Sequence, residues 1–122
     1  MCKKDEEKII AEKIYNTVVI DGMEYYKEMF ETKEYSSFKE PDWINAINFY
    51  RNLNEEEKGM FYKIIKMIIV DTAASTVAIF DGITTLSGGG AFETEVVIDG
   101  VNTVPFLHEY FLEVDEEQEK YK

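Results

Sequence analysis

The spacing of apolar residues predicts helices over the first part of the chain. Across residues 5–32, apolar side chains recur every three or four positions, as they do on one face of a helix. Asp21-Gly22 is a place where this helix can break or kink, because glycine costs roughly 1 kcal/mol in a helix interior. A second helix is expected over residues 41–53, since proline suits a first helical turn, and residues 33–39 are expected to form a loop.

A third helix has the clearest start signal in the chain. Asn54 can cap the helix, and Glu57 can complete a capping box with it. The acidic residues of this first turn also meet the positive end of the helix dipole. The helix is expected over residues 55–79. Its second half is apolar nearly all round, which predicts that it lies buried at the centre of the fold.

The pattern changes after Asp81-Gly82. Residues 83–86 are rich in β-branched side chains, and residues 92–98 alternate between apolar and polar in the way of a half-exposed strand. Asp99-Gly100 is a strong signal for a hairpin turn. We therefore expect a three-stranded antiparallel meander within residues 83–104.

A last amphipathic helix is expected after Pro105. Its buried face is predicted to hold a run of large apolar side chains: Phe106, Leu107, Tyr110, Phe111 and Val114. The predicted fold class is α+β, with three N-terminal helices that include a central buried helix, a small three-stranded antiparallel meander and a C-terminal helix. Residues 1–122 are expected to form a single domain, frayed at residues 1–4 and 116–122.

Charge is distributed unevenly along the chain. The 122 residues carry 25 acids against 13 bases, for a formal net charge of −12. Residues 67–119 hold 11 of those acids and neither lysine nor arginine. A field of one sign speeds encounter with an oppositely charged partner, and net charge also keeps a protein dissolved. The sequence leaves open whether the charge serves a basic partner or only solubility.

Composition and charge argue against several classes of protein. The acidic field repels phosphates and anionic lipids, so direct binding of DNA, RNA or a membrane surface is not expected. The longest apolar stretch, residues 67–80, is interrupted by polar side chains and is shorter than the ~20 residues of a membrane span. Cys2 is the only cysteine, so we expect a reduced thiol and a cytoplasmic location. A cysteine followed by polar residues also begins a processed bacterial lipoprotein, which leaves a lipid anchor at Cys2 as the alternative.

No constellation of residues in the sequence predicts catalysis. His108 is the only histidine, and a zinc motif on a helix needs a second one. Asp71 interrupts the most apolar helix, where a buried carboxylate could act as an acid or base or simply accept a hydrogen bond from a core hydroxyl. The acids from Asp71 to Asp99 lack the spacing of a calcium-binding loop. We expect no enzymatic activity, no metal and no cofactor.

Short segments of the second half resemble a type of small acidic bacterial protein found among toxin-immunity and uncharacterised sequences. The likeness covers residues 50–114, and four segments carry it: Asn54-Glu55-Glu56-Glu57, Ile69-Val70-Asp71-Thr72, Phe80-Asp81-Gly82 and Leu107-His108-Glu109-Tyr110-Phe111-Leu112. The resemblance implies a cytoplasmic immunity protein. Such a protein binds a toxin domain tightly, covers its active site and has no catalytic residues of its own.

The expected function is therefore an immunity-type inhibitor of a basic bacterial toxin or nuclease domain. The acidic field would speed encounter, and a tight complex would need an aromatic anchor amid the charge, for which Tyr110 is the candidate. The predicted contact surface lies on the hairpin and the last helix: Glu93, Glu95, Asp99, Glu109, Tyr110, Glu113, Asp115, Glu116 and Glu117. The chain itself is expected to be a monomer or a weak homodimer.

Two other functions are compatible with the sequence. The alternative is a nucleic-acid mimic of the anti-restriction or anti-CRISPR type, which presents carboxylates where a DNA-binding enzyme expects phosphates. The third hypothesis is an enzyme that uses Asp71 or His108, and it requires those two groups to converge in one open cleft.

Overall fold

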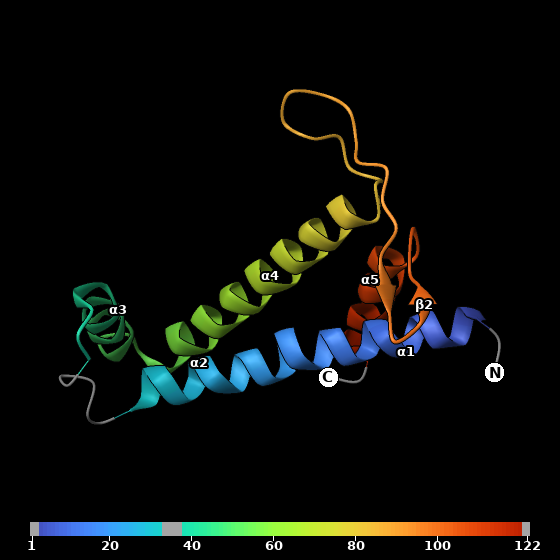
Figure 1. Cartoon of the computed structure of the whole chain (residues 1–122). Helices are drawn as coiled ribbons and strands as arrows, with labels where there is room; N and C mark the ends of the chain where they lie inside the picture. Colours follow the sequence, from blue (N-terminus) through green and yellow to red (C-terminus); the bar gives the residue numbers. More distant parts are fainter. Residues whose placement is uncertain (1–2, 33–37, 121–122) are drawn as a thin grey trace.

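The computed structural model describes residues 3–32 and 38–120. A long helical rod runs along one side of the molecule, and the remaining elements pack against its two ends (Figure 1). The elements, in chain order, are α1 (Lys3–Tyr15), the π-helix η1 (Asn16–Asp21), α2 (Gly22–Glu31), α3 (Pro41–Arg51), α4 (Glu55–Phe80), β1 (Val97–Ile98), β2 (Val101–Asn102) and α5 (Leu107–Lys120).

The rod is formed by α1, η1 and α2, which follow one another without a break (Figure 1). Asp21 and Gly22 both keep right-handed helical dihedral angles, so the helix does not break at this pair. Its irregularity is the wider π-turn just before it. The predicted helix over residues 5–32 is therefore confirmed, with a local change of pitch in place of a break.

The far end of the rod holds an aromatic cluster. Phe30 of α2 packs between Tyr50 of α3 and Phe61 of α4, with ring centroids 5.5 Å and 4.9 Å away. The Tyr50 hydroxyl donates a hydrogen bond to the Glu31 carboxylate. Burial raises the pKa of Tyr50 above its ordinary value, and the bond to Glu31 raises it further. These contacts bind α3 to α2 and α4.

A second core lies at the other end, where α5 returns to α1. Tyr15 and Phe111 are fully buried there, with their ring centroids 5.3 Å apart. Val70 of α4 and Val19 of η1 complete this cluster. Helix α5 is therefore held against both the rod and the middle of α4. Figure 1 shows it lying beside α1.

The predicted three-stranded meander is wrong. In the described chain the only sheet is the antiparallel pair of β1 and β2, with Val97 opposite Asn102 and Ile98 opposite Val101. The hairpin turn between them is confirmed, since Asp99 and Gly100 have φ angles of +50° and +78°. The fold is mostly helical, and the α+β prediction does not hold.

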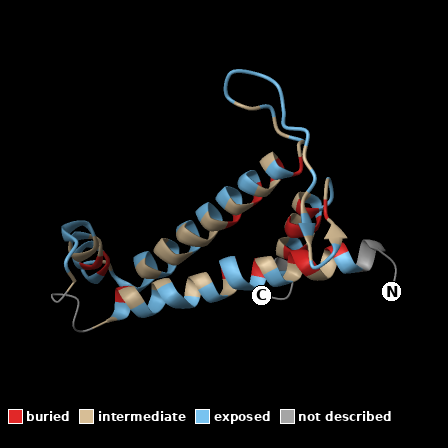
Figure 2. Cartoon of the chain, viewed as in Figure 1, coloured by how far each residue is buried: buried red, intermediate tan, exposed pale blue. Residues whose placement is uncertain are grey.

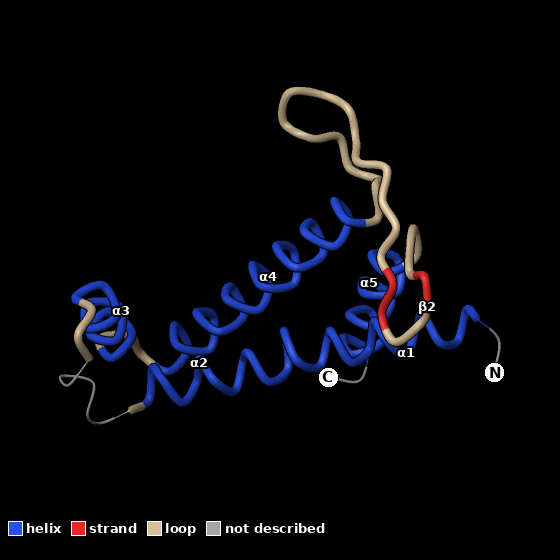
Figure 3. Tube along the Cα trace, viewed as in Figure 1, coloured by secondary structure: helices blue, strands red, loops and turns tan. Residues whose placement is uncertain are grey.

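The reason is that residues 83–92 form a loop that extends away from the helices (Figure 3). Backbone pairing with the second arm of the hairpin begins only at Val96, whose carbonyl accepts a hydrogen bond from the Thr103 N–H at 2.9 Å. Gly88, Gly89 and Gly90 all have positive φ angles and reverse the chain in an open loop. The exposure still alternates over residues 93–98, as the sequence predicted, although Phe92 is exposed beside Glu93. Alternation alone supplies no neighbouring strand.

The prediction of a central buried helix is also wrong. Only three residues of α4 are buried, and they are small or β-branched: Val70, Ala74 and Ala78. Figure 2 shows that most of α4 is exposed or half-buried. The helix packs on the rod and α5 along one side only, so an apolar residue on its other side stays in water. A sequence that is apolar all round therefore does not ensure burial in this fold.

Some of the predicted ends can be placed and others cannot. Helix α5 continues to Lys120 and α1 begins at Lys3, so most of the residues expected to fray are helical. Residues 1–2, which include Cys2, residues 33–37 of the expected loop and residues 121–122 lie outside the described part of the chain.

The capping box at the start of α4 is confirmed. Asn54 Oδ1 accepts a hydrogen bond from the Glu57 backbone N–H at 2.8 Å, and Glu57 Oε1 accepts one from the Asn54 N–H at 2.9 Å. We expect Asn54→Ala to lower the free energy of unfolding by about 1 kcal/mol, because a helix N–H loses its acceptor. Urea unfolding followed by circular dichroism measures this loss. Asn45→Ala, at an exposed position within α3, is the matched control, and an equal loss there would contradict the capping role.

Candidate protein-binding surface

The acidic half of the chain, residues 67–119, gathers at one end of the molecule. It comprises the second half of α4, the projecting loop, the hairpin and most of α5 (Figure 1). Its 11 acids have no lysine or arginine among them in the sequence. Lys8 of α1, which lies outside this half, pairs with Glu113 and Glu117, so the field at the loop and hairpin is carried by the acids that remain.

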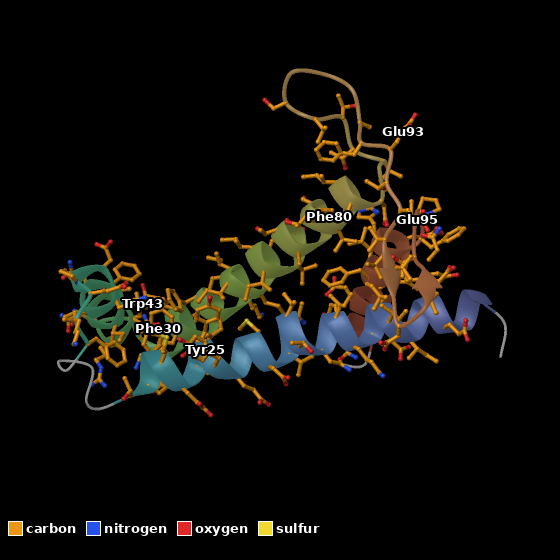
Figure 4. The ribbon with its side chains drawn as sticks, in the orientation of Figure 1. Tyr25, Phe30, Trp43, Phe80, Glu93 and Glu95 are labelled. Carbon is orange, nitrogen blue, oxygen red and sulfur yellow. The ribbon has the colours of Figure 1, made fainter. Side chains whose placement is uncertain are left out.

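The three predicted acids of the loop and hairpin are exposed. Glu93 and Glu95 lie on the arm of the loop that leads into β1, and both side chains reach away from the helices (Figure 4). Asp99 lies at the tip of the hairpin. These carboxylates can meet a partner without moving any part of the core.

The predicted acids of α5 divide into two groups. Glu109 and Glu116 are exposed. By contrast, Lys8 of α1 donates hydrogen bonds to Glu113 at 2.8 Å and to Glu117 at 2.7 Å. These bonds raise the pKa of Lys8 above its ordinary value, with Glu113 as the larger cause. Glu113 and Glu117 therefore bind α5 to the rod.

Asp115 also has an internal contact. Its Oδ1 atom accepts a hydrogen bond from the Tyr15 hydroxyl at 2.7 Å. This contact lies beside the packing of Tyr15 on Phe111, so Asp115 helps to dock α5. Like Glu113 and Glu117, it adds charge to the acidic half while already binding α1.

Tyr110, the predicted anchor, is buried, with 5% of its surface exposed. It packs with Ile10 and Ala11 of α1 and with Leu107 of α5. Four of the five residues predicted for the buried face of this helix are indeed buried, but Phe106 is 41% exposed. The exposed aromatic residue of this region is therefore Phe106, which directly precedes α5, and not Tyr110 within it.

Three exposed apolar residues near the loop were missed by the sequence reasoning. Phe80, Ile83 and Phe92 are each 53% exposed. Phe80 ends α4 close to the segment that carries Glu93 and Glu95, as Figure 4 shows. The alternating pattern placed Phe92 in a half-exposed strand of the predicted meander. Because the protein forms no strand at that position, the Phe92 side chain has no sheet around it and stays exposed.

The base of the loop is closed by a glycine. Gly82 has a φ angle of +71°, and a Cβ atom there would lie 2.6 Å from the Phe92 carbonyl oxygen. Only glycine fits this contact, which brings the two arms of the loop together. Nearer the tip, the Leu86 N–H donates to the Gly90 carbonyl at 2.7 Å. The loop therefore presents Phe92 and Glu93 from a defined base.

The buried carboxylate of this region is Asp81, and the prediction that Asp71 is buried is wrong. Asp71 lies exposed on α4, whereas Asp81 is 3% exposed at the end of that helix. Asp81 Oδ2 accepts a hydrogen bond from the His108 backbone N–H at 2.6 Å, in the first turn of α5. Burial raises the pKa of Asp81, and the bond from His108 partly offsets that rise.

Asp81 also borders an apolar hollow of about 300 Å³. Its other walls come from α4, the hairpin and the start of α5: Val77, Phe80, Val96, Ile98, Thr103 and Leu107. Asp71 and His108 line two different hollows, so they do not converge in one cleft. Over residues 3–32 and 38–120, no three metal-ligating side chains come together. The charged and apolar side chains of this region are suited to binding, and they do not form a set of catalytic groups over the described residues.

The longest apolar stretch in the sequence, residues 67–80, forms the second half of α4. Over the described residues, no helix is both long and apolar enough to cross a membrane.

Replacing Asp81 tests its role as the acceptor that joins α4 to α5. We expect Asp81→Ala to lower the free energy of unfolding by about 1–3 kcal/mol, because a buried N–H loses its acceptor. Asp81→Asn keeps an acceptor oxygen and should lose less. Urea unfolding at neutral pH measures both values, and equal losses in the two variants would contradict the acceptor role.

The pH dependence of the same pair tests the direction of the pKa shift. Since the pKa of Asp81 is raised by folding, its stabilising contribution is present below the unfolded pKa and is lost as pH rises through the folded pKa. Asp81→Asn cannot lose that contribution. The stability of Asp81→Asn relative to the unmodified chain should therefore improve as pH rises from acid to neutral, and a constant difference would show that the pKa is not raised.

Comparison with known protein families, curated proteins and solved structures finds no match to this chain. The resemblance of residues 50–114 to toxin-immunity proteins therefore stays a prediction. What the site can do has to be argued from its own geometry and charge.

Proposed function

We propose that the protein is an immunity-type inhibitor, which binds and blocks a basic bacterial toxin or nuclease domain in the cytoplasm. One observation carries the proposal. The acidic half combines exposed carboxylates with exposed aromatic side chains at one end of the molecule, and no basic residue in its sequence competes for those carboxylates. Charge of this kind selects a basic partner, and the aromatic side chains supply the contacts of a tight complex.

The field of the acidic half governs the first step of binding. Uncompensated carboxylates of one sign raise the association rate with a basic surface and repel phosphates and anionic lipids. The same field therefore favours a protein partner over a nucleic acid. The effect weakens as salt rises, because ions screen the exposed charges.

The contact surface of the proposed complex differs from the one the sequence suggested. Its carboxylates are the exposed members of the predicted set: Glu93, Glu95, Asp99, Glu109 and Glu116. Its anchors are Phe80, Phe92 and Phe106, in place of the buried Tyr110. Burial of an exposed aromatic side chain by a partner contributes strongly to the free energy of binding. These three residues are therefore expected to slow dissociation.

The shape of the loop supports inhibition beyond simple binding. Residues 83–92 form an uncharged loop beyond the end of α4, with the glycine turn at its tip (Figure 3). Glu93 and Glu95 follow on the arm that leads from this loop into the hairpin, where they can meet the rim of the concave, basic groove in which a nuclease holds its substrate. The hydrogen bond of Asp81 and the close contact at Gly82 fix the base of the loop, which limits the ordering that binding requires.

The partner can be identified by capture from a lysate of the native host and mass spectrometry. A basic toxin or nuclease that is released by salt, and whose activity the chain inhibits, would support the proposal. Capture of a DNA-binding enzyme that loses its DNA would replace it with the nucleic-acid mimic. Failure to inhibit a toxin encoded beside the chain would contradict the immunity role.

Charge reversal tests how the complex forms. We expect the triple variant Glu93→Lys, Glu95→Lys and Asp99→Lys to associate with the captured partner at least about tenfold more slowly at low salt, because steering is lost. The matched control reverses three exposed acids outside the acidic half: Glu6, Asp21 and Glu28. Surface-based kinetics measure both. Equal slowing in the two variants would show that net charge, and not this surface, sets the rate.

Truncation of an aromatic side chain tests how the complex is held. Phe92→Ala should raise the dissociation rate while leaving the association rate nearly unchanged, because a short-range contact is removed and the charge stays. Phe49→Ala, at an exposed phenylalanine of α3, is the control and should alter neither rate. If Phe92→Ala dissociates like the unmodified chain, the loop is not part of the contact.

A further inference from the structure

The outer side of α4 carries a stripe of four exposed apolar residues. Met60, Ile64, Met67 and Ile68 follow one another at helical spacing and are 55%, 48%, 64% and 58% exposed. We call these four residues the α4 stripe. In Figure 1 no described helix or strand covers the side of α4 that faces away from the rod. A contiguous apolar face of this kind marks an interaction surface.

The accessible surface area of the chain also supports an interaction surface. Its accessible area is 8493 Å², whereas a folded monomer of 14.2 kDa exposes about 6,800 Å². The excess is about 1,700 Å², and a stable interface buries about 800 Å² on each partner. The open arrangement of helices and the extended loop both contribute to this excess (Figure 1), which is larger than the area that an ordinary interface buries on one partner.

A groove beside the stripe is shaped to receive side chains. It has a volume of about 330 Å³ and almost entirely apolar walls from α2, α3 and α4: Tyr26, Phe30, Trp43, Phe61, Ile65, Ile68 and Ile69. Ile68 belongs to both the groove and the α4 stripe. Figure 4 shows Phe30 and Trp43 together beside the N-terminal end of α4. A flexible methionine side chain presented from outside would fit such a groove.

We propose that the α4 stripe is the interface of a homodimer, in which α4 of a second copy lies antiparallel across it. Ile64 then meets Ile68 of the second copy, and Met67 meets its own counterpart close to the two-fold axis. Both copies bury the same surface, as a symmetric dimer requires. In this register Met67 of each copy lies opposite Ile65 of the other, so its side chain can reach the edge of the groove, whereas Met60 lies opposite Thr72 and outside it.

Charge decides between the antiparallel and the parallel arrangement. Asp71 is exposed one turn beyond Ile68, the last residue of the stripe, and Lys63 is exposed directly before Ile64. In the antiparallel arrangement each Asp71 comes within reach of Lys63 of the second copy, so two opposite-charge pairs form. A parallel arrangement would place Asp71 beside Asp71 and the two acidic halves side by side, where like charges repel.

Sedimentation equilibrium of the full chain tests the dimer directly. We expect a reversible monomer–dimer equilibrium that tightens as NaCl rises from about 0.05 to about 0.5 M, because salt screens the repulsion between two chains of net charge −12. The complex with a basic partner should respond to salt in the opposite direction, so the two proposals can fail separately. A chain that stays monomeric at every concentration and salt would overturn the dimer.

A charged substitution in the stripe tests the contact. Ile64→Glu should weaken dimerisation at least about 30-fold, since Ile64 lies near the centre of the interface. Val97→Glu, at a 56% exposed residue of the hairpin, adds the same charge outside the stripe and should change it little. Circular dichroism confirms that both variants keep their helices. Equal weakening by the two variants would overturn the proposed surface.

Disulfide cross-linking tests the orientation without relying on a disruptive variant. In a Cys2→Ser background, Met67→Cys should form a dimer-linking disulfide on mild oxidation, because the two positions meet near the axis. Met60→Cys should not, since its two copies lie about 20 Å apart along an antiparallel pair. Cross-linking at both positions would indicate a parallel pair, and cross-linking at neither would place the interface elsewhere. Either result overturns the antiparallel contact.

Discussion

The hydrogen bond from the His108 N–H to the buried Asp81 carboxylate governs how the second half of the chain is presented. It joins the end of α4 to the start of α5, so that the loop and hairpin between them, residues 82–107, begin and end at the same place. Because both ends of this segment are fixed, Phe80, Phe92 and Phe106 remain at the same end of the molecule as the exposed acids. A carboxylate buried at this junction is less favourable when charged, and the N–H that it accepts offsets part of that cost.

The acids of the second half serve two structural roles. Glu113 and Glu117 bind Lys8, and Asp115 binds the Tyr15 hydroxyl, so these carboxylates attach α5 to the rod. The acids of the loop and hairpin face water and carry the field outward. This division lets the protein concentrate negative charge at one end while part of that charge also stabilises the packing beneath it.

Local signals in the sequence predicted the local structure well. The capping box at Asn54 and the turn at Asp99-Gly100 depend on residues a few positions apart, and both are confirmed. The meander failed because a strand needs a partner that only the tertiary fold supplies. Burial of a residue on α4 likewise depends on which side of the helix the rod and α5 cover. The sequence pattern does not contain that information, so it indicates Asp71 as the buried acid in place of Asp81.

In the proposed complex the acidic end, and not the α4 stripe or the aromatic cluster, contacts the partner. Hydrogen–deuterium exchange of the chain, alone and bound to that partner, tests this most directly because it reports protection along the whole backbone. We expect new protection concentrated in residues 81–109. Protection confined to α2, α3 and the first half of α4, with the loop and hairpin exchanging as in the free protein, would contradict it.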